Sequence, residues 1–527
     1  MTVPAGLATT LSIQWRTNGR VILLWLVSVA GTFALTAWSI ASLYNTPEKI
    51  ATYADSIAGG ALYAINGKVE GINTLGGVIQ DEFAFMGAFL LPLLGISLIA
   101  RATRREEEAG RLELLLSGRI DRLSPLTGAL LWTWATIAAL CVAFFVVLIP
   151  TDFPTSGAAL YTFSLGGLAF VFAAFAAVAA QATLHSRGVY ISSLAALVVA
   201  YVLRGVGDAT GTWVTWLSPL GWQEKTAATG GQHWWVLTLP LIAGLTLSGL
   251  ALVLNSRRDL GSALIQSSGG PAEASAMLKS PLGFALWLHR PTQIAWLAGS
   301  VVLAVMMGVL AQDVIDAFTS NQQIADMIGA NVDHPEDAFA AMVQLYIALI
   351  GFGYAIQAVS TLRREEAAGR LETVLSGARS RTAWLGIQLA VITAGLVVIV
   401  VIASATFAAC TALSMGSGAE LTRLFASGLA YLPAELLVLG LAALMFGAFA
   451  RYFSVLWGYY AVVAFLAFLG NAIKLPSLLV DLAPTTHVGD PPQGPVEPAG
   501  LIVMSVAALT LTAVAFRGFS RRDIPTN

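Results

Sequence analysis

Residues 104–118 read R-R-E-E-E-A-G-R-L-E-L-L-L-S-G, and residues 363–377 read R-R-E-E-A-A-G-R-L-E-T-V-L-S-G. Three of the fifteen paired positions differ: Ala367, Thr373 and Val374 stand where the first copy has Glu108, Leu114 and Leu115. Similarity this close over such a length indicates an internal duplication. The chain is therefore expected to consist of two related halves, each carrying one of these repeated segments.

The composition of the chain is that of an integral membrane protein. Hydrophobic residues make up 57% of its 527 residues and charged residues only 11%, whereas about 25% of the residues of a soluble protein are charged. So few charges cannot cover a water-facing surface, and a bundle of transmembrane helices is expected. The net charge of −2 argues against nucleic acid as a partner. Cys141 and Cys410 lie in apolar runs and are expected to be core residues, not parts of a disulfide framework or a metal site.

Apolar stretches near 20 residues predict about twelve transmembrane helices. The first half has six, at 21–43, 83–101, 124–149, 159–183, 189–206 and 235–254. The second half has another six, at 292–311, 341–361, 382–412, 425–450, 455–471 and 499–517. The two shortest stretches, 189–206 and 455–471, could instead be half-spans or re-entrant segments. Each repeated segment follows the second span of its half, and six spans separate the copies. The sequence thus predicts an all-α membrane protein built as two parallel six-helix repeats, a fused pseudo-dimer.

Lysine and arginine gather on one side of this arrangement. They cluster around the repeated segments, at 101–122 and 363–381, and again at the C-terminal end. The positive-inside rule makes that side cytoplasmic, with both termini inside a plasma membrane. The expected domains are 1–258 and 281–527, each with six helices, joined by a cytoplasmic linker at 259–280 whose serines, glycines and proline predict flexibility.

Each repeated segment is rich in helix formers and contains no proline, so a short amphipathic helix along the inner membrane surface is expected. Gly110 and Gly369 would lie in mid-helix, where glycine costs about 1 kcal/mol relative to alanine. Their presence there favours the close approach of another backbone. The alternative is a simple lipid anchor with snorkelling arginines. Anionic lipids would repel Glu106, Glu107 and Glu113, so docking of a partner protein is preferred.

The chain lacks the phosphate-binding loop of an ATPase, because no G-x-x-x-x-G-K-[ST] sequence occurs in it. The Leu-Ser-Gly ends of the repeated segments could begin an ATPase signature. However, Arg119 and Ala378 follow where a second glycine would be needed. The chain is therefore expected not to bind ATP by that route, and it has no cofactor or catalytic residue of its own.

The repeated segments and the twelve-span layout resemble the membrane subunits of ABC-2-type (type V) exporters. The long, fused actinobacterial permeases of the tetronasin-exporter type are the most similar. The resemblance covers nearly the whole chain in layout, but its specific motif, E-E-x-A-G-R-x-E-x-L-L-S-G, covers only the two repeated segments. In that family this motif forms the coupling helix, which seats in a cleft of the nucleotide-binding subunit. The stretches near 8–20 and 280–291 would correspond to connecting helices before each half.

The resemblance implies that the repeated segments dock on two ABC ATPase subunits, which bind ATP and magnesium. The docking residues it assigns are Arg105, Glu106, Glu107, Gly110, Arg111, Glu113 and Ser117 in the first copy and Arg364, Glu365, Glu366, Gly369, Arg370, Glu372 and Ser376 in the second. The complex would export hydrophobic or amphipathic small molecules such as antibiotics and drugs. The three substitutions between the copies imply docking sites of different strength.

Four polar residues in the expected spans are possible members of a transport pathway: Gln181, Gln344, Gln357 and Glu435. An ionisable residue in a span is a functional hypothesis by default. The structural alternatives are helix packing for the glutamines and a location near the headgroups for the glutamate. The five histidines lie far apart in the sequence and form no recognisable metal or catalytic set.

Two other functions stay open. A proton- or ion-coupled transporter of the major facilitator type also has twelve spans, a parallel repeat and a charged motif after the second span. That motif has an Asp-Arg pair and basic residues around a glycine, not consecutive glutamates, and Glu435 is nearly the only carboxylate expected in a span here. A membrane-embedded lipid-modifying enzyme would need clustered catalytic residues, and the sequence shows none.

Overall fold

The computed structural model describes residues 4–57, 63, 66–151, 153–264, 273–320, 334–377, 380–416, 418, 420–469 and 477–523. Every regular element within these ranges is a helix, which confirms the expected all-α membrane fold. The chain divides into two compact units, Met1–Gly270 and Pro271–Asn527. Each unit contains one of the repeated segments.

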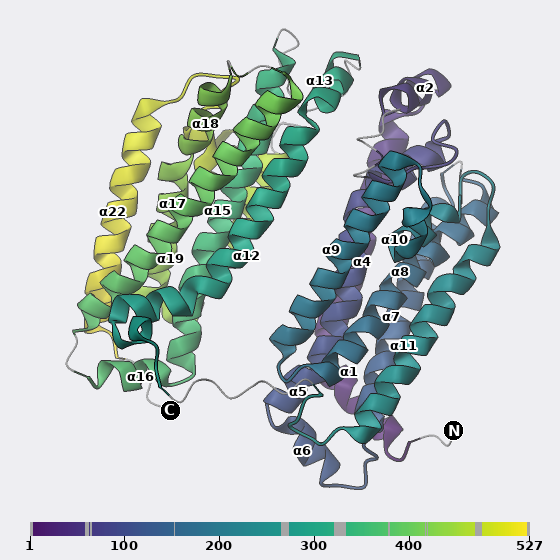
Figure 1. The fold of residues 1–527 in the computed structure, drawn as a ribbon, viewed down its shortest axis with the longest axis horizontal. Coiled ribbons are helices and arrows are strands. Elements are labelled where there is room, and N and C mark those ends of the chain that lie inside the picture. Colours follow the sequence, from purple (N-terminus) through teal and green to yellow (C-terminus); the bar gives the residue numbers. More distant parts are fainter. Residues whose placement is uncertain are drawn as a thin grey trace. The chain divides into compact units, whose positions relative to one another are not determined.

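Within its described residues, the first unit has six long helices (Figure 1). They are α1 (Leu7–Leu43), α4 (Leu75–Ala102), α7 (Ser124–Leu148), α8 (Thr155–Ala182), α9 (Ser186–Thr210) and α11 (Thr238–Arg257). Short helices join them: α2 (Pro47–Ser56), α5 (Arg104–Glu108), α6 (Arg111–Leu116), η1 (Trp213–Leu217), α10 (Pro219–Lys225) and η2 (Trp234–Leu237). Helices α5 and α6 lie at the opposite end of the bundle from α2 (Figure 1).

The second unit repeats this order. Its long helices are α12 (Pro281–Val309), α15 (Pro335–Ala367), α17 (Arg381–Ser414), α18 (Leu421–Leu429) followed by α19 (Leu432–Ala448), α20 (Val455–Leu469) and α22 (Pro498–Arg521). The short elements are η3 (Ala276–Lys279), α13 (Ala311–Ser320), α16 (Arg370–Leu375), η4 (Ala450–Tyr452), α21 (Ser477–Val480) and η5 (Pro484–His487).

Local sequence marks the ends of these helices. The hydroxyls of Thr74 and Ser380 accept hydrogen bonds from the backbone N–H groups of Gly77 (3.0 Å) and Ala383 (3.2 Å), which caps α4 and α17. Proline stands in the first turn of α12, α15 and α22, where its missing N–H costs nothing. Helix α9 ends at Gly211, whose φ of 65° suits a helix C-terminus.

Both units share one packing scheme, as the duplication predicts. In each unit the first long helix packs on the third, and the second and sixth pack on the fourth. In the first unit these pairs are α1 with α7, α4 with α8 and α11 with α8. In the second unit they are α12 with α17, α15 with α19 and α22 with α19. The second helices lie at the centre, because 61% of the most apolar part of α4 and 78% of that of α15 is buried, against 22% for α1. Small residues permit this approach. A Cβ at Gly95 of α4 would lie 2.7 Å from the Ala169 carbonyl oxygen of α8.

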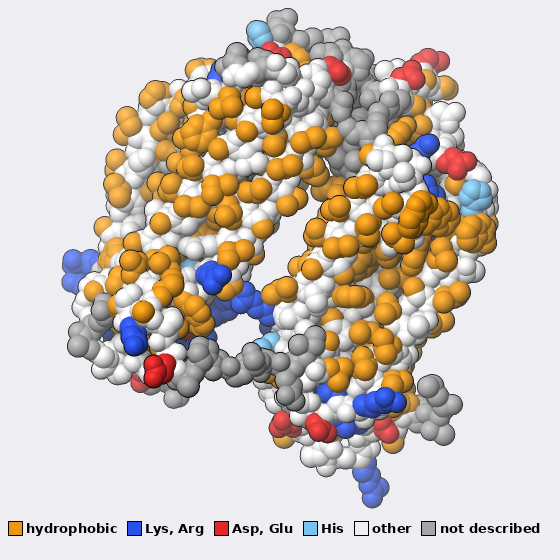
Figure 2. All heavy atoms as spheres, in the orientation of Figure 1, with side chains coloured by type: hydrophobic (Ala, Val, Ile, Leu, Met, Phe, Trp, Pro, Cys, Tyr) orange, Lys and Arg blue, Asp and Glu red, His pale blue; other side chains and the backbone are white. Residues whose placement is uncertain are grey.

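Large apolar side chains remain exposed on the outer helices. On α1 alone, Leu24, Val27, Leu35 and Trp38 are exposed, and hydrophobic side chains cover the visible faces of the long helices in each unit, with charged side chains towards their ends (Figure 2). Eleven helices among the described residues are long and apolar enough to cross a membrane. These exposed faces are suited to lipid.

The structure changes several expected boundaries. The stretch at 189–206 belongs to α9, a helix of 25 residues, and is long enough to span. The described helix in the stretch at 455–471, α20, has 15 residues and falls short of that length. The stretches near 8–20 and 280–291, which were expected as connecting helices, are almost entirely helical, and they are continuous with the first long helix of each unit, α1 and α12. Part of the expected linker, 265–272, lies outside the described residues, as do residues 321–333.

Candidate functional site

The repeated segments are bent at their glycines. Gly110 has φ of 68° and separates α5 from α6, and Gly369 has φ of 71° and separates α15 from α16. This left-handed conformation favours glycine over any residue with a Cβ. A Cβ at either position would meet no atom within 4 Å. The continuous amphipathic helix expected over each segment is therefore wrong, and each glycine serves the bend. The close approach of another protein's backbone at these glycines stays a prediction.

An ion pair crosses each bend. The Arg111 guanidinium donates to both carboxylate oxygens of Glu106, at 2.7 and 2.8 Å. Arg370 donates in the same way to Glu365, at 2.7 and 2.6 Å. The arginine side chains are 53% and 60% exposed, and the hydrogen bonds that they donate to the glutamates raise the pKa of each arginine. Bidentate ion pairs of this kind hold a defined angle between the helices on either side of the glycine.

Beyond the bend, each segment presents a short exposed helix anchored by one leucine. Leu112 and Leu371 are buried, whereas the other side chains of α6 and α16 mostly point into solvent. The exposed positions include Arg105, Arg111, Glu113 and Ser117 in the first unit and Arg364, Arg370, Glu372 and Ser376 in the second. We call α6 and α16 the tips. A tip with charged, outward-facing side chains is suited to contact with another protein.

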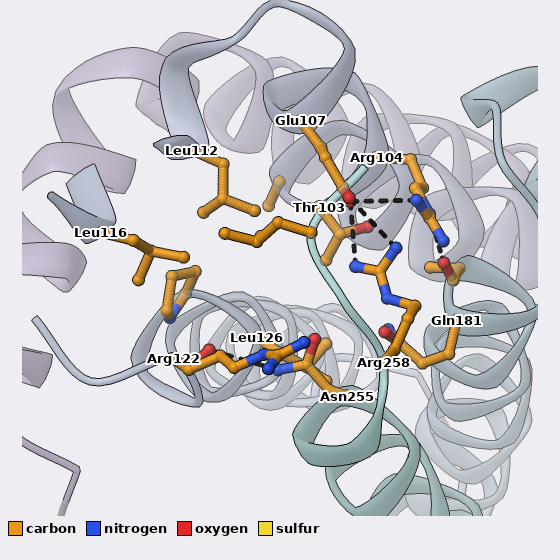
Figure 3. Close-up of a pocket in the computed structure, with 14 residues that line it drawn as sticks. Thr103, Arg104, Glu107, Leu112, Leu116, Arg122, Leu126, Gln181, Asn255 and Arg258 are labelled. Atoms are coloured by element: carbon orange, nitrogen blue, oxygen red, sulfur yellow. Dashed lines mark hydrogen bonds and ion pairs between the residues drawn. The ribbon is translucent and has the colours of Figure 1, made fainter. Parts of the chain in front are cut away.

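Two of the expected docking residues point inward instead. The Glu107 and Glu366 side chains are 9% and 1% exposed. Arg258 Nη1 and Nη2 donate to the two oxygens of Glu107 at 3.1 and 3.0 Å, and Arg522 Nη1 and Nη2 donate to the two oxygens of Glu366, the second at 2.9 Å. Figure 3 shows the first pair beside a cavity of about 20 Å³ that Leu112 and Leu116 face from the other side. These carboxylates hold each segment to its own unit.

Sequence reasoning missed the two arginines that make these contacts. Arg258 directly follows α11 and Arg522 directly follows α22, the sixth long helix of each unit. A signal for them was present in the sequence, because residues 256–259 and 520–523 both read S-R-R-D. This second, shorter repeat lies at the end of the sixth long helix of each unit, whereas the longer repeat follows the second long helix.

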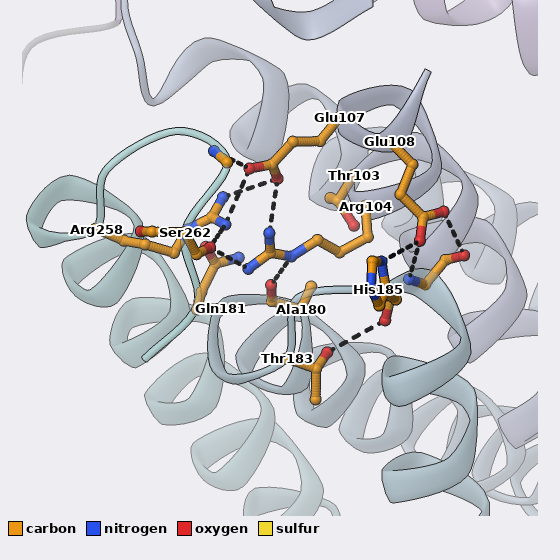
Figure 4. Close-up of polar contacts among 12 residues, drawn as sticks. Thr103, Arg104, Glu107, Glu108, Ala180, Gln181, Thr183, His185, Arg258 and Ser262 are labelled. Atoms are coloured by element: carbon orange, nitrogen blue, oxygen red, sulfur yellow. Dashed lines mark hydrogen bonds and ion pairs between the residues drawn. The ribbon is translucent and has the colours of Figure 1, made fainter. Parts of the chain in front are cut away.

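The first segment has an attachment that the second lacks. Glu108 accepts hydrogen bonds from the Ser186 backbone N–H (2.9 Å) and hydroxyl (2.7 Å), and the His185 ring lies 3.3 Å away (Figure 4). These partners lie at the turn between α8 and α9. Ala367 occupies the matching place in the second unit and carries no carboxylate, so the substitution removes this tether.

Comparison with known proteins adds a family to this geometry. Residues 278–520 match the model described as "Multidrug efflux system permease Rv1217c, C-terminal domain". Over 466 residues the chain is 32% identical to "Multidrug efflux system permease protein Rv1217c" of Mycobacterium tuberculosis (strain ATCC 25618 / H37Rv), and the match covers 85% of this chain and 84% of that protein. The chain belongs to this multidrug efflux permease family. Membership in this family makes the chain a membrane permease.

One of the four polar span residues of the permease, Gln181, lies in the first unit, and the other three, Gln344, Gln357 and Glu435, lie in the second. Gln181 bonds within its own helix, to the Ala177 carbonyl at 3.1 Å. Gln344 donates to the Leu424 carbonyl at 2.9 Å, which joins α15 to α18. Gln357 is half-buried in α15. The contacts of Gln181 and Gln344 match helix packing.

Glu435 lies fully buried at the start of α19. Among the described residues, neither of its carboxylate oxygens has a hydrogen-bond partner. A Cβ at Gly351 of α15 would come within 2.5 Å of one of these oxygens, so the glycine makes room for the carboxyl. The side chain is therefore enclosed between the second and fourth long helices of its unit.

Glu435 is not nearly alone, contrary to the sequence-based expectation. Helix α4 begins at Leu75, two turns earlier than expected, and so includes Asp81, which is 3% exposed. Helix α9 continues to Thr210 and includes Asp208, which is 9% exposed. Both carboxylates thus belong to long helices of the first unit, at the end opposite to α5 and α6 in Figure 1.

These carboxylates belong to a buried polar network that sequence reasoning did not find. The Tyr53 hydroxyl lies 2.7 Å from Asp81 and 2.9 Å from Glu82, and burial raises the pKa of the Tyr53 phenol. Arg204 pairs with Glu224 at 3.3 Å. Burial also raises the pKa of Glu224, although Arg204 opposes the shift. No short sequence pattern marked these residues, because they lie on four separate elements, α2, α4, α9 and α10.

Proposed function

We propose that this permease is the transmembrane subunit of an ATP-driven ABC-2-type exporter, of the fused, tetronasin-exporter-like kind. The observation that carries the proposal is the pair of tips. Each unit presents the same glycine-bent helix after its second long helix, with charged side chains exposed and a Glu–Arg pair fixing the bend. Two equivalent protruding helices fit two copies of one partner protein.

The partner we propose is an ABC ATPase that binds ATP and magnesium, one copy for each tip. Arg105, Glu106, Arg111, Glu113 and Ser117, with their counterparts in the second unit, would form the contact. Glu107 and Glu366 are excluded from it because they are buried in pairs within the chain. The permease would lie in the inner (plasma) membrane with both termini and both tips in the cytoplasm, as the positive-inside rule predicts.

The substrates we propose are lipophilic or amphipathic small molecules, as the name of the related permease suggests for drug efflux. The first unit has an open apolar groove of about 730 Å³ on its surface between α7, α8 and α11, a volume within the range typical of small-molecule sites. Aromatic and aliphatic side chains line it, among them Trp134, Phe145, Phe163, Phe170 and Leu241. Its apolar lining supports this substrate class.

The test is reconstitution with and without a candidate ABC ATPase. The complex should co-purify, and proteoliposomes should accumulate a lipophilic dye only when ATP and magnesium are present on the side of the tips. The permease alone should not hydrolyse ATP. Dye transport driven by a proton gradient, without ATPase or ATP, would instead establish the secondary-transporter alternative.

A further inference from the structure

We infer that Arg258 and Arg522 are positioning residues that couple each repeated segment to the end of the sixth long helix in its own unit. The inference rests on the proposed function, because it concerns how a movement of the tips would reach the membrane helices. It starts from the ion pairs Glu107–Arg258 and Glu366–Arg522, which we call the linkage pairs.

The linkage pairs occupy equivalent places. Glu107 and Glu366 are matching positions of the longer repeat, and Arg258 and Arg522 are matching positions of the S-R-R-D repeat. Both arginines are the first residue beyond the sixth helix of a unit. Each pair therefore joins the segment that follows the second helix to the end of the sixth helix.

The contacts around the two pairs differ, while the pair itself is retained. In the first unit, Glu107 also accepts from the Gly261 backbone N–H (2.9 Å) and from Arg104 (3.1 Å), as Figure 4 shows for the arginines. In the second unit, the Arg522 guanidinium lies over the rings of Phe446 (5.3 Å) and Phe519 (5.4 Å). The second unit repeats the contact of Arg104, because Arg363 lies 3.3 Å from Glu366. Each unit thus keeps the linkage pair and a second arginine three residues before the glutamate, while the other contacts differ.

The geometry is suited to transmitting movement. A guanidinium that binds both oxygens of a carboxylate constrains distance and angle together. The end of each sixth helix is also tied to the start of the third: Asn255 donates to the Arg122 carbonyl at 3.2 Å, and Arg381 donates to the Arg522 carbonyl at 2.7 Å. Because α11 packs along α8 and α22 along α19, a displacement of a tip would move the sixth helix against the fourth.

The linkage is buried, so water does not compete for it. The Arg258 and Glu107 side chains are 5% and 9% exposed, and those of Arg522 and Glu366 are 16% and 1% exposed. By contrast, Arg257 and Arg521, the neighbouring arginines of the same repeat, are exposed. These neighbours provide matched controls of the same residue type.

The experiment compares Arg258→Gln/Arg522→Gln with Arg257→Gln/Arg521→Gln in the full-length permease, at matched abundance and with the ATPase. If the linkage transmits movement, the first variant should still bind the ATPase and hydrolyse ATP at the basal rate. Its dye transport and its substrate stimulation of ATP hydrolysis should fall about tenfold or more, a change typical of a lost coupling free energy. The control variant should resemble the wild type.

A charge swap separates transmission from simple support. Glu107→Arg with Arg258→Glu, and Glu366→Arg with Arg522→Glu, restore the opposite charges with exchanged positions and should recover most of the lost transport. Wild-type transport by Arg258→Gln/Arg522→Gln would overturn the inference. So would a loss of transport that the swap does not recover at all.

Hydrogen exchange on the permease alone gives a readout that does not need the ATPase. The amides of 104–118 and 363–377 should exchange faster in Arg258→Gln/Arg522→Gln, and the control should leave them unchanged. Unchanged exchange in the variant would overturn the linkage even if the complex exports. The two proposals can fail separately. If the wild-type permease binds no ATPase, the proposed function is contradicted. If the amides of 104–118 and 363–377 still exchange faster in Arg258→Gln/Arg522→Gln, the linkage pairs stand.

Discussion

At the scale of single residues, Gly110 and Gly369 set the shape of the repeated segments. Each occupies the left-handed region with open space around it. Substitution there acts through the backbone and not through a clash. Asparagine tolerates this conformation better than other side chains, and β-branched residues tolerate it least.

We therefore expect Gly110→Val to loosen the first segment by about 1–2 kcal/mol, the cost of a left-handed conformation, and Gly110→Asn to cost less. Gly118→Val is the matched control, because a Cβ at Gly118 meets only the Leu115 carbonyl oxygen at 3.6 Å. Hydrogen exchange of α6 measures the effect. Equal exchange in Gly110→Val and Gly118→Val would show that the bend does not depend on glycine.

Glu435 is fully buried, so its surroundings limit the size and charge of any side chain that can replace it. Glutamine has nearly the same size and no charge, so Glu435→Gln should retain the folded protein and its transport. Glu435→Lys should reduce membrane abundance strongly, since an unpaired buried cation costs several kcal/mol. Quantitative immunoblotting and dye transport at matched abundance check both. Loss of transport by a well-folded Glu435→Gln variant would show that the carboxylate itself takes part in transport.

At the scale of elements, the contact between the second and fourth long helices organises each unit. In the first unit Gly95 of α4 lies against the backbone of α8. A large side chain there must push the helices apart. Gly31 of α1, by contrast, has no atom within 4 Å of the place of a Cβ.

Gly95→Leu should therefore destabilise the first unit by about 1–3 kcal/mol, the usual cost of overpacking, and Gly31→Leu should be nearly neutral. Thermal unfolding in detergent, followed by size-exclusion chromatography, measures the difference. A Gly95→Leu variant as stable as Gly31→Leu would mean that α4 and α8 do not approach this closely in the membrane.

At the scale of the whole molecule, the duplication predicts a parallel repeat, with both tips on the same face of the membrane. Single cysteines in a background without Cys141 and Cys410 test this topology. Leu114 and Thr373 are exposed on the two tips, and cysteines there should react only when the cytoplasmic side is accessible. Cysteines at Glu48 and Val496, both exposed, should react from outside. Labelling of the two tips from opposite sides would exclude a parallel repeat.

The sequence by itself determined the class of fold. Long apolar stretches require helices that bond their own backbone groups in lipid, and the repeat of 104–118 at 363–377 requires two related units. The same residues were enough to locate the protruding segments. The ends of the helices were predicted less accurately, because α4 and α9 extend beyond their apolar stretches to include Asp81 and Asp208.

Only the tertiary structure decided how the repeated segments are held. Periodicity placed Glu106 and Glu107 on one continuous helix, but the left-handed conformation of Gly110 turns the chain, so that Glu106 faces Arg111 and Glu107 faces inward. Arg258 is distant from Glu107 in sequence, and their pairing depends on α11 returning along α8 to the end where the segment lies. Local pattern reports propensity and exposure along one element, whereas contacts between distant elements arise from packing, which periodicity does not encode.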